Sequence, residues 1–187
     1  MQLLEKIINE ATIKKILVVT GLYIIIFYVI NYSSIGMKGL LEITNGASTL
    51  DFVNGYSVEQ AYNILSQLGE VGRAFYKNKI LPLDYIFPMG NMLLFVSWMS
   101  FSLERFKNVK KYFKWLLLIP VIAMVADWIE NICITIMLYY YPVTLNGICK
   151  ISSISTGIKF IAVKLGLSCT VILAVVSLFL YLIGKRR

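Results

Sequence analysis

Four apolar stretches constrain the fold of this chain more than any other feature of its sequence. They cover residues 16–32, 85–103, 115–141 and 158–183. A helix needs about 20 mainly apolar residues to cross the hydrocarbon core of a bilayer, and within that core its backbone groups must bond to one another. The sequence therefore predicts an all-α integral membrane protein, with four transmembrane helices in one bundle and a single membrane domain over residues 1–187.

The composition supports this class. Hydrophobic residues make up 58% of the chain and charged residues 15%, whereas a soluble domain is close to half apolar and a quarter charged. The first stretch is long for the apolar part of a signal peptide, and no convincing small-x-small cleavage site follows it. We interpret it as an uncleaved membrane anchor.

The basic residues predict how the chain is oriented. Eleven of the 18 Lys and Arg residues flank the four stretches on one side, namely Lys6, Lys14, Lys15, Arg105, Lys107, Lys110, Lys111, Lys114, Lys185, Arg186 and Arg187. The positive-inside rule then places both termini in the cytoplasm. We interpret the net charge of +8 as anchoring to the phospholipid bilayer, and no nucleic-acid partner is expected.

The predicted external segment between the first two spans, residues 33–83, is too long for a simple connector. Its first half, residues 36–51, is typical of a turn-rich loop. Ser57 is a plausible N-cap with Gln60 as its capping-box partner, and apolar residues at helical spacing follow. We therefore expect an external amphipathic helix over residues 58–77, lying on the membrane as a lid or as a plain surface helix.

The stretch V125-A-D-W-I-E-N-I-C-I134 places polar side chains in the middle of the third span. Asp127, Glu130 and Asn131 follow one another at i, i+3 and i+4, so they share one helix face. An ionised carboxylate at this depth is costly unless it is paired or hydrated, and two acids one turn apart do not both ionise easily. This face is a candidate functional site. The alternative is that its residues only hold helices together.

Matching polar residues occur at the predicted outer ends of the neighbouring helices. Lys159 and Arg73 would balance the acidic charge, although Lys159 could also be an ordinary interfacial lysine, and Asn91 and Thr156 could simply join helices. The candidate ligand-binding residues are Arg73, Tyr76, Asp84, Asn91, Asp127, Glu130, Asn131, Thr156 and Lys159. If the protein is an enzyme, Asp127 and Glu130 are the candidate catalytic pair.

Several absences narrow the chemistry. The chain has no histidine, which excludes imidazole ligands to haem or zinc and histidine-dependent nucleophilic catalysis. Its three cysteines show no CxxC spacing, and neither an ATP-binding loop nor a nucleophile elbow is present. We therefore predict no metal site and no cofactor.

Four short motifs carry a resemblance. In order, they are G69-E-V-G-R-A-F-Y76, D84-Y-I-F-P88, D127-W-I-E-N131 and T156-G-I-K159. This order resembles a group of small, uncharacterised bacterial four-span membrane proteins with the pattern GxxGRxxY, DxxFP, DxxEN and TxxK. The resemblance runs from about Leu50 to the end of the fourth span, and Phe160 stands where that pattern has tryptophan. It implies that the motif residues belong together, and that the chain lies in a bacterial cytoplasmic membrane, but it implies no activity.

Three functions remain open. The preferred one is a membrane-embedded binding protein or carrier, whose acidic cavity in the outer half of the bundle holds a small amphipathic or cationic ligand. The second is an enzyme on a lipid or isoprenoid, with Asp127 and Glu130 as acid and base and Lys159 or Arg73 stabilising negative charge. The third is a non-catalytic subunit or immunity-type protein that docks a partner helix or a second copy.

Overall fold

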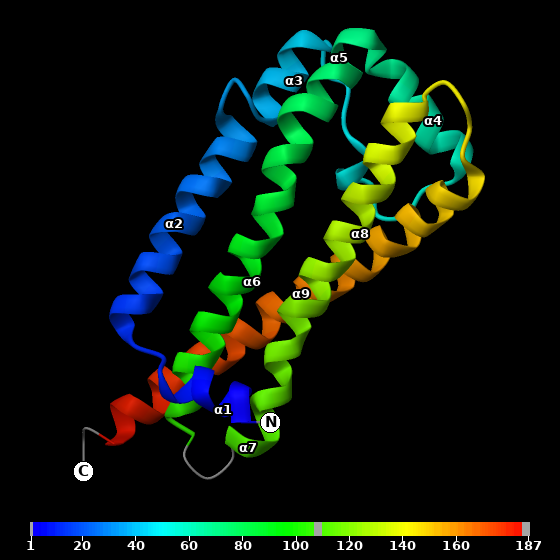
Figure 1. Cartoon of the computed structure of the whole chain (residues 1–187). Helices are drawn as coiled ribbons and strands as arrows, with labels where there is room; N and C mark the ends of the chain where they lie inside the picture. Colours follow the sequence, from blue (N-terminus) through cyan, green and yellow to red (C-terminus); the bar gives the residue numbers. More distant parts are fainter. Residues whose placement is uncertain (1, 107–109, 185–187) are drawn as a thin grey trace.

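The computed structural model describes residues 2–106 and 110–184, which fold into helices joined by short loops (Figure 1). Lys107, Lys185, Arg186 and Arg187, used above to predict orientation, lie outside these residues. The helices are α1 (Gln2–Asn9), α2 (Ile13–Tyr32), α3 (Met37–Ile43), α4 (Val58–Gln67), α5 (Gly69–Phe75), α6 (Leu81–Glu104), α7 (Lys110–Phe113), α8 (Leu118–Tyr140) and α9 (Asn146–Gly184). Three further turns are η1 (Leu50–Phe52), the π-helical η2 (Tyr76–Ile80) and η3 (Lys114–Leu117).

Four helical segments are long and apolar enough to cross a membrane: Ile13–Ile43, Gly69–Glu104, Lys114–Tyr140 and Asn146–Ile183. The predicted spans fall within them, except that Tyr141 lies just beyond α8. Apolar side chains remain exposed around α2 and the second half of α9. Exposed apolar area on this scale fits a lipid environment, so the chain is a multi-pass membrane protein.

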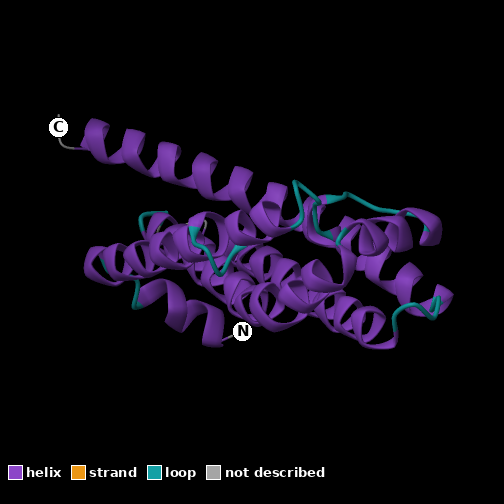
Figure 2. Cartoon of the chain, turned by 90° about the horizontal axis from the view of Figure 1, so that it is seen from above, coloured by secondary structure: helices purple, strands orange, loops and turns teal. Residues whose placement is uncertain are grey.

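Helix α6 lies at the centre of the arrangement and packs against α2, α8 and α9, while α8 and α9 form the most extensive helix pair. Helix α9 runs obliquely behind α6 and α8 in Figure 1, and its last turns extend away from the other helices in Figure 2. Helices α3, α4 and α5 gather at one end of the molecule, and α1 and α7 at the other (Figure 1). We refer to these as the α4 end and the α1 end.

The helix expected over residues 58–77 is not continuous: residues 58–67 and 69–77 are helical, but the chain turns at Leu68. Its start is confirmed, because Ser57 Oγ accepts a bond from the Gln60 amide at 3.1 Å and Gln60 Oε1 accepts one from the Ser57 amide at 2.9 Å. However, the helix ends at Gln67, and Gly69 has a φ of +62°, which glycine adopts at no steric cost. The chain turns there, and α5 and η2 lead directly into α6.

The turn-rich loop expected over residues 36–51 also contains structure, namely α3 and η1. Met37, Leu40 and Leu50 are buried in a core cluster with residues of α4, α6 and α8. Tyr56 anchors the end of this segment on α9, since its amide donates to Ser153 Oγ at 2.8 Å and its hydroxyl to Ser152 Oγ at 2.7 Å. Burial raises the pKa of Tyr56, so the hydroxyl stays protonated as a donor, and η1 is held in place above the helices.

The first turns of α9 and the helix α1 were also not predicted. Helix α9 begins at Asn146 and not at residue 158, because its first turns bury serine and threonine side chains in place of apolar ones. Helix α1 packs on the bundle through the buried side chain of Ile8. It is also tied to η3, where the buried Lys114 lies 2.6 Å from Glu5 Oε1.

Candidate functional site

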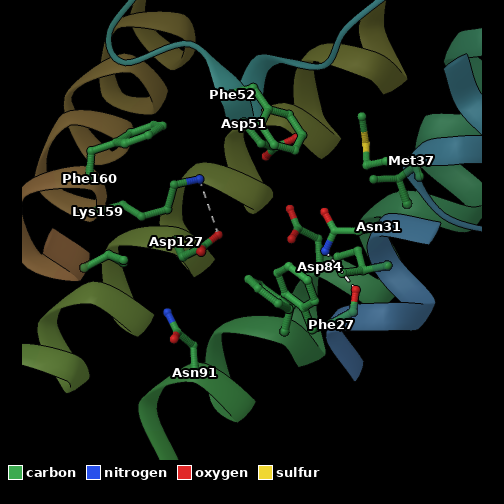
Figure 3. Close-up of a pocket in the computed structure, with 14 residues that line it drawn as sticks. Phe27, Asn31, Met37, Asp51, Phe52, Asp84, Asn91, Asp127, Lys159 and Phe160 are labelled. Atoms are coloured by element: carbon green, nitrogen blue, oxygen red, sulfur yellow. Dashed lines mark hydrogen bonds and ion pairs between the residues drawn. The ribbon is translucent and has the colours of Figure 1, made fainter. Parts of the chain in front are cut away.

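A cavity of about 270 Å³ lies towards the α4 end of the molecule, between α2, α6, α8 and α9 and beside η1 (Figure 3). Its walls combine acidic, amide and aromatic side chains. The lining residues are Phe27, Ile30, Asn31, Met37, Asp51, Phe52, Ile80, Asp84, Phe87, Asn91, Asp127, Lys159, Phe160 and Val163. Three carboxyl groups and one amine therefore face a single space.

The position of Asp84 follows from a proline one turn later. Pro88 lies inside α6, and because proline has no N–H it leaves the carbonyl of Asp84, four residues earlier, without its helical donor. Asn131 on α8 supplies the missing donor, with Nδ2 3.0 Å from Asp84 O. Trp128 Nε1 donates in the same way to Tyr85 O at 3.0 Å. The turn of α6 that precedes Pro88 is thus joined to the acidic face of α8.

The acids of α8 are held by residues of α9. Lys159 forms ion pairs with Glu130 and with Asp127, whose Oδ1 lies 3.8 Å from Nζ. Thr156 Oγ1 donates to Glu130 Oε1 at 2.6 Å, and Asn131 Nδ2 also reaches Asp127 Oδ1 at 3.2 Å. Glu130 is fully buried and does not line the cavity. Asp127 does line it, so the two acids have different access to a ligand.

Asp51 brings a further carboxyl group to the cavity from η1. The hydroxyl of Tyr76, itself fully buried, donates a short hydrogen bond to Asp51 Oδ2. The other oxygen, Oδ1, is buried and accepts no hydrogen bond from the described residues. One side of this carboxyl group is therefore fixed, while the other has no protein donor.

Asp84 is the most exceptional residue of the site. Its side chain points into the cavity (Figure 3), and the residue is only 8% exposed. Within residues 2–106 and 110–184, no hydrogen bond or ion pair reaches its carboxyl group; its one cross-helix bond is made by its backbone oxygen. A buried carboxyl group without a partner is costly whenever it is ionised, and such residues inside a membrane commonly have a function.

The cluster carries more acid than base. Asp51, Asp84, Asp127 and Glu130 gather around a single cation, Lys159. Lys159 already contacts both Asp127 and Glu130, and no other cation in the described part of the chain pairs with Asp51 or Asp84. The site as a whole therefore favours an added positive charge.

Most of the predicted site residues are brought together. The cavity is lined by four of them, Asp84, Asn91, Asp127 and Lys159. Three more bond to these lining residues or to each other, namely Glu130, Asn131 and Thr156. Tyr76 contacts the cavity only through its hydrogen bond to Asp51.

Arg73 does not join the site, which corrects the expected role in charge balance. Its Nη1 donates to Leu65 O at 2.9 Å, and its guanidinium group lies 4.0 Å from the ring centre of Tyr141. The turn at Gly69 directs α5 so that Arg73 closes the corner between α4 and α8. No contact links it to the cavity acids.

Sequence reasoning missed several lining residues. Asp51 is the most important of them, and its only signal was an acid at the end of the turn-rich stretch. Asn31, at the end of α2, and the rings of Phe27, Phe52 and Phe87 carried no signal beyond their apolar surroundings. Phe160 was noted only as the aromatic residue that follows Lys159.

The site shows no arrangement for a metal, since no three His, Cys, Asp or Glu side chains in the described part of the chain are placed to bind one ion. Comparisons with known proteins found no match: no family model matches the chain, and neither a curated protein nor a solved structure matches it. The function must therefore be argued from the cavity itself.

Proposed function

We propose that this protein binds or carries a small cationic or cationic amphipathic ligand, whose positively charged head lies in the acidic cavity. The observation that carries the proposal is the buried carboxyl group of Asp84, which faces the cavity without a partner. A bound ammonium group would provide the missing charge and N–H donors. Its binding would offset the free-energy cost of burying the carboxylate of Asp84 without a partner.

The walls of the cavity support a cationic ligand. The rings of Phe27, Phe52, Phe87 and Phe160 line it together with the acids, and the negative face of an aromatic ring attracts a cation. Lys159 itself lies 5.7 Å from the ring centre of Phe160, so one cation–ring contact already exists there. The same rings would accept the apolar part of an amphipathic ligand.

The size of the cavity limits the head group. A volume of about 270 Å³ corresponds to roughly nine waters at the volume each occupies in the liquid. A simple amine or a small alkylammonium group fits this space. A larger apolar tail would have to leave the cavity between the exposed apolar surfaces of α2 and α9.

The two alternatives have less support. An acid–base pair would need both carboxyl groups to reach the substrate, whereas Glu130 is fully buried and bonded to Lys159 and Thr156. A partner helix would need the polar residues on the outer surface. Asp84, Asp127 and Asn131 are instead buried between helices, which favours an internal ligand.

The proposal is tested by identifying what the protein carries. The wild type, Asp84→Asn and the exposed-acid control Glu59→Gln would be purified in mild detergent, and co-purifying small molecules measured by mass spectrometry. We expect a defined amine or cationic lipid with the wild type and the control, reduced at least about tenfold in Asp84→Asn. Equal amounts in all three folded proteins would overturn the proposal.

A further inference from the structure

A second cavity, of about 620 Å³, lies near the α1 end of the molecule. It is bounded by the start of α2, the last turns of α6 and the second half of α9. These are three of the helices that enclose the acidic cavity, but the residues that line the second cavity lie nearer the α1 end of each helix. Helix α9 extends away from the other helices in this region (Figure 2). The second cavity is therefore a separate site on the same side of α6.

The walls of this cavity are mostly apolar, and its polar lining residues are Ser102, Ser177 and Arg105. Ile13, Leu178 and Tyr181 line it, and each of them is at least half exposed. Trp98 is another lining residue, but its ring N–H is already used in a bond to Thr20 Oγ1 at 3.2 Å. Apolar walls of this kind match a hydrocarbon chain better than they match water.

Arg105 is the charged residue of the rim. Its guanidinium group lies 4.0 Å from the ring centre of Phe101, and its Nη1 donates to Ser177 Oγ at 3.4 Å. No carboxylate among residues 2–106 and 110–184 pairs with it. A guanidinium group has five N–H donors in a fork that matches a phosphate, and among the described residues only Ser177 accepts a hydrogen bond from Arg105.

The charge around this cavity also favours an anion. The sequence flanking the spans at the α1 end holds eleven Lys and Arg residues against three acids, Glu5, Glu10 and Glu104. Glu10 is already paired with Lys6 and Lys15, and Glu5 with Lys114. Basic pockets between transmembrane helices at a membrane surface are typical sites for anionic lipid head groups.

We propose that this second cavity binds one anionic phospholipid. The phosphate lies on the guanidinium group of Arg105 beside Ser177, and an acyl chain fills the apolar space between α2 and α9. A peptide or a partner helix would not match a cavity whose single charged side chain lies at the rim. The lipid would support the second half of α9, which is otherwise exposed. This inference does not depend on the ligand of the acidic cavity.

The test is native mass spectrometry of the delipidated protein with defined lipids. Palmitoyl-oleoyl phosphatidylglycerol and the zwitterionic phosphatidylcholine of the same chains would be titrated into the wild type, Arg105→Gln and Lys150→Gln. Lys150 is an exposed lysine near the α4 end, so its variant is matched in charge. We expect phosphatidylglycerol to bind the wild type and Lys150→Gln equally, and Arg105→Gln roughly tenfold more weakly.

A second variant separates lost binding from lost folding. Ala174→Phe would fill the cavity from α9 and leave Arg105 unchanged, and it should also lose the lipid. Thermal unfolding would check that each variant is folded. The proposal would be overturned if the wild type bound phosphatidylglycerol and phosphatidylcholine equally. It would also be overturned if Arg105→Gln bound phosphatidylglycerol as well as Lys150→Gln does, or if folded Ala174→Phe bound it fully. Asp84→Asn should keep the lipid, which distinguishes this site from the acidic cavity.

Discussion

Asp84 combines two properties that oppose each other, since a carboxyl group that attracts a ligand also destabilises the empty protein. Replacing it with asparagine keeps its shape and removes the charge. We predict that ligand-free Asp84→Asn is more stable than the ligand-free wild type by about 1–3 kcal/mol. Thermal unfolding of extensively washed protein in detergent measures this difference. A clear loss of stability would mean that Asp84 has a structural partner.

Replacing Lys159 should lower the stability of the protein, whereas replacing Asp84 should raise it. It is the single cation that contacts Asp127 and Glu130, so Lys159→Met leaves two buried acids uncompensated. We predict a loss of about 3–5 kcal/mol, the range found when one partner of a buried ion pair is removed. Denaturant unfolding of this variant would be compared with that of Lys164→Met, an exposed lysine on the same helix whose loss should cost about 0.5 kcal/mol or less.

A further substitution tests the cause of that loss. Adding Glu130→Gln to Lys159→Met removes one of the unpaired charges, so part of the lost stability should return. A double variant that is as unstable as the sum of its parts would argue against coupling between these residues.

For single residues, the sequence predicts a large part of the site. Helical spacing is enough to place Asp127, Glu130 and Asn131 on one face, because the rise and turn of a helix are fixed. It cannot place Asp51, which depends on how a loop folds back over the helices. Helical spacing also misplaces Arg73, because Gly69, with its positive φ, changes the direction of the helix that carries Arg73.

Among the helices, the contact between α6 and α8 explains why a proline and an asparagine occur together. Pro88 frees the carbonyl of Asp84, and Asn131 donates to it. We predict that Asn131→Ala costs about 2 kcal/mol in the wild type and about 1 kcal/mol less in a Pro88→Ala background, where the new backbone N–H can serve the same carbonyl. A double-mutant cycle by thermal unfolding measures this coupling, and an additive result would contradict it.

The limits of the helices show what apolar runs can and cannot predict. The four spans are recognised because their interiors must be apolar over about 20 residues. The start of α9 is missed because Ser152, Ser153 and Thr156 interrupt the apolar run. In the fold, however, the hydroxyl groups of all three have hydrogen-bond partners. The two serines bond to Tyr56, and Thr156 bonds to Glu130 and to the backbone oxygen of Ser152. The break at Leu68 is missed because buried residues keep helical spacing on both sides of it.

For the whole molecule, the positive-inside rule predicts that the α1 end is cytoplasmic and the α4 end external. With the three native cysteines replaced by alanine, Glu59→Cys should react with a membrane-impermeant maleimide in intact cells. Glu10→Cys should react only after the cells are opened. The reverse pattern would mean that the acidic cavity lies towards the cytoplasm.

The two cavities together suggest how the molecule is organised. Both lie where α2, α6 and α9 face one another, with carboxyl groups near the α4 end and an arginine near the α1 end. Opposite charges at opposite ends suit different occupants, namely a cationic ligand in one cavity and an anionic lipid in the other. Helix α9 carries residues of both sites, with Lys159 in the acidic cavity and Ser177 in the second one.

The central claim is that the acidic cavity selects for positive charge. It is tested most directly by the affinity of the protein in lipid nanodiscs for a short alkylammonium ion and for the neutral alcohol of the same length. We predict that the wild type and Glu59→Gln prefer the ammonium ion at least about tenfold, and that Asp84→Asn loses most of this preference. A wild type that binds both probes equally, or an Asp84→Asn variant that keeps the full preference, would contradict it.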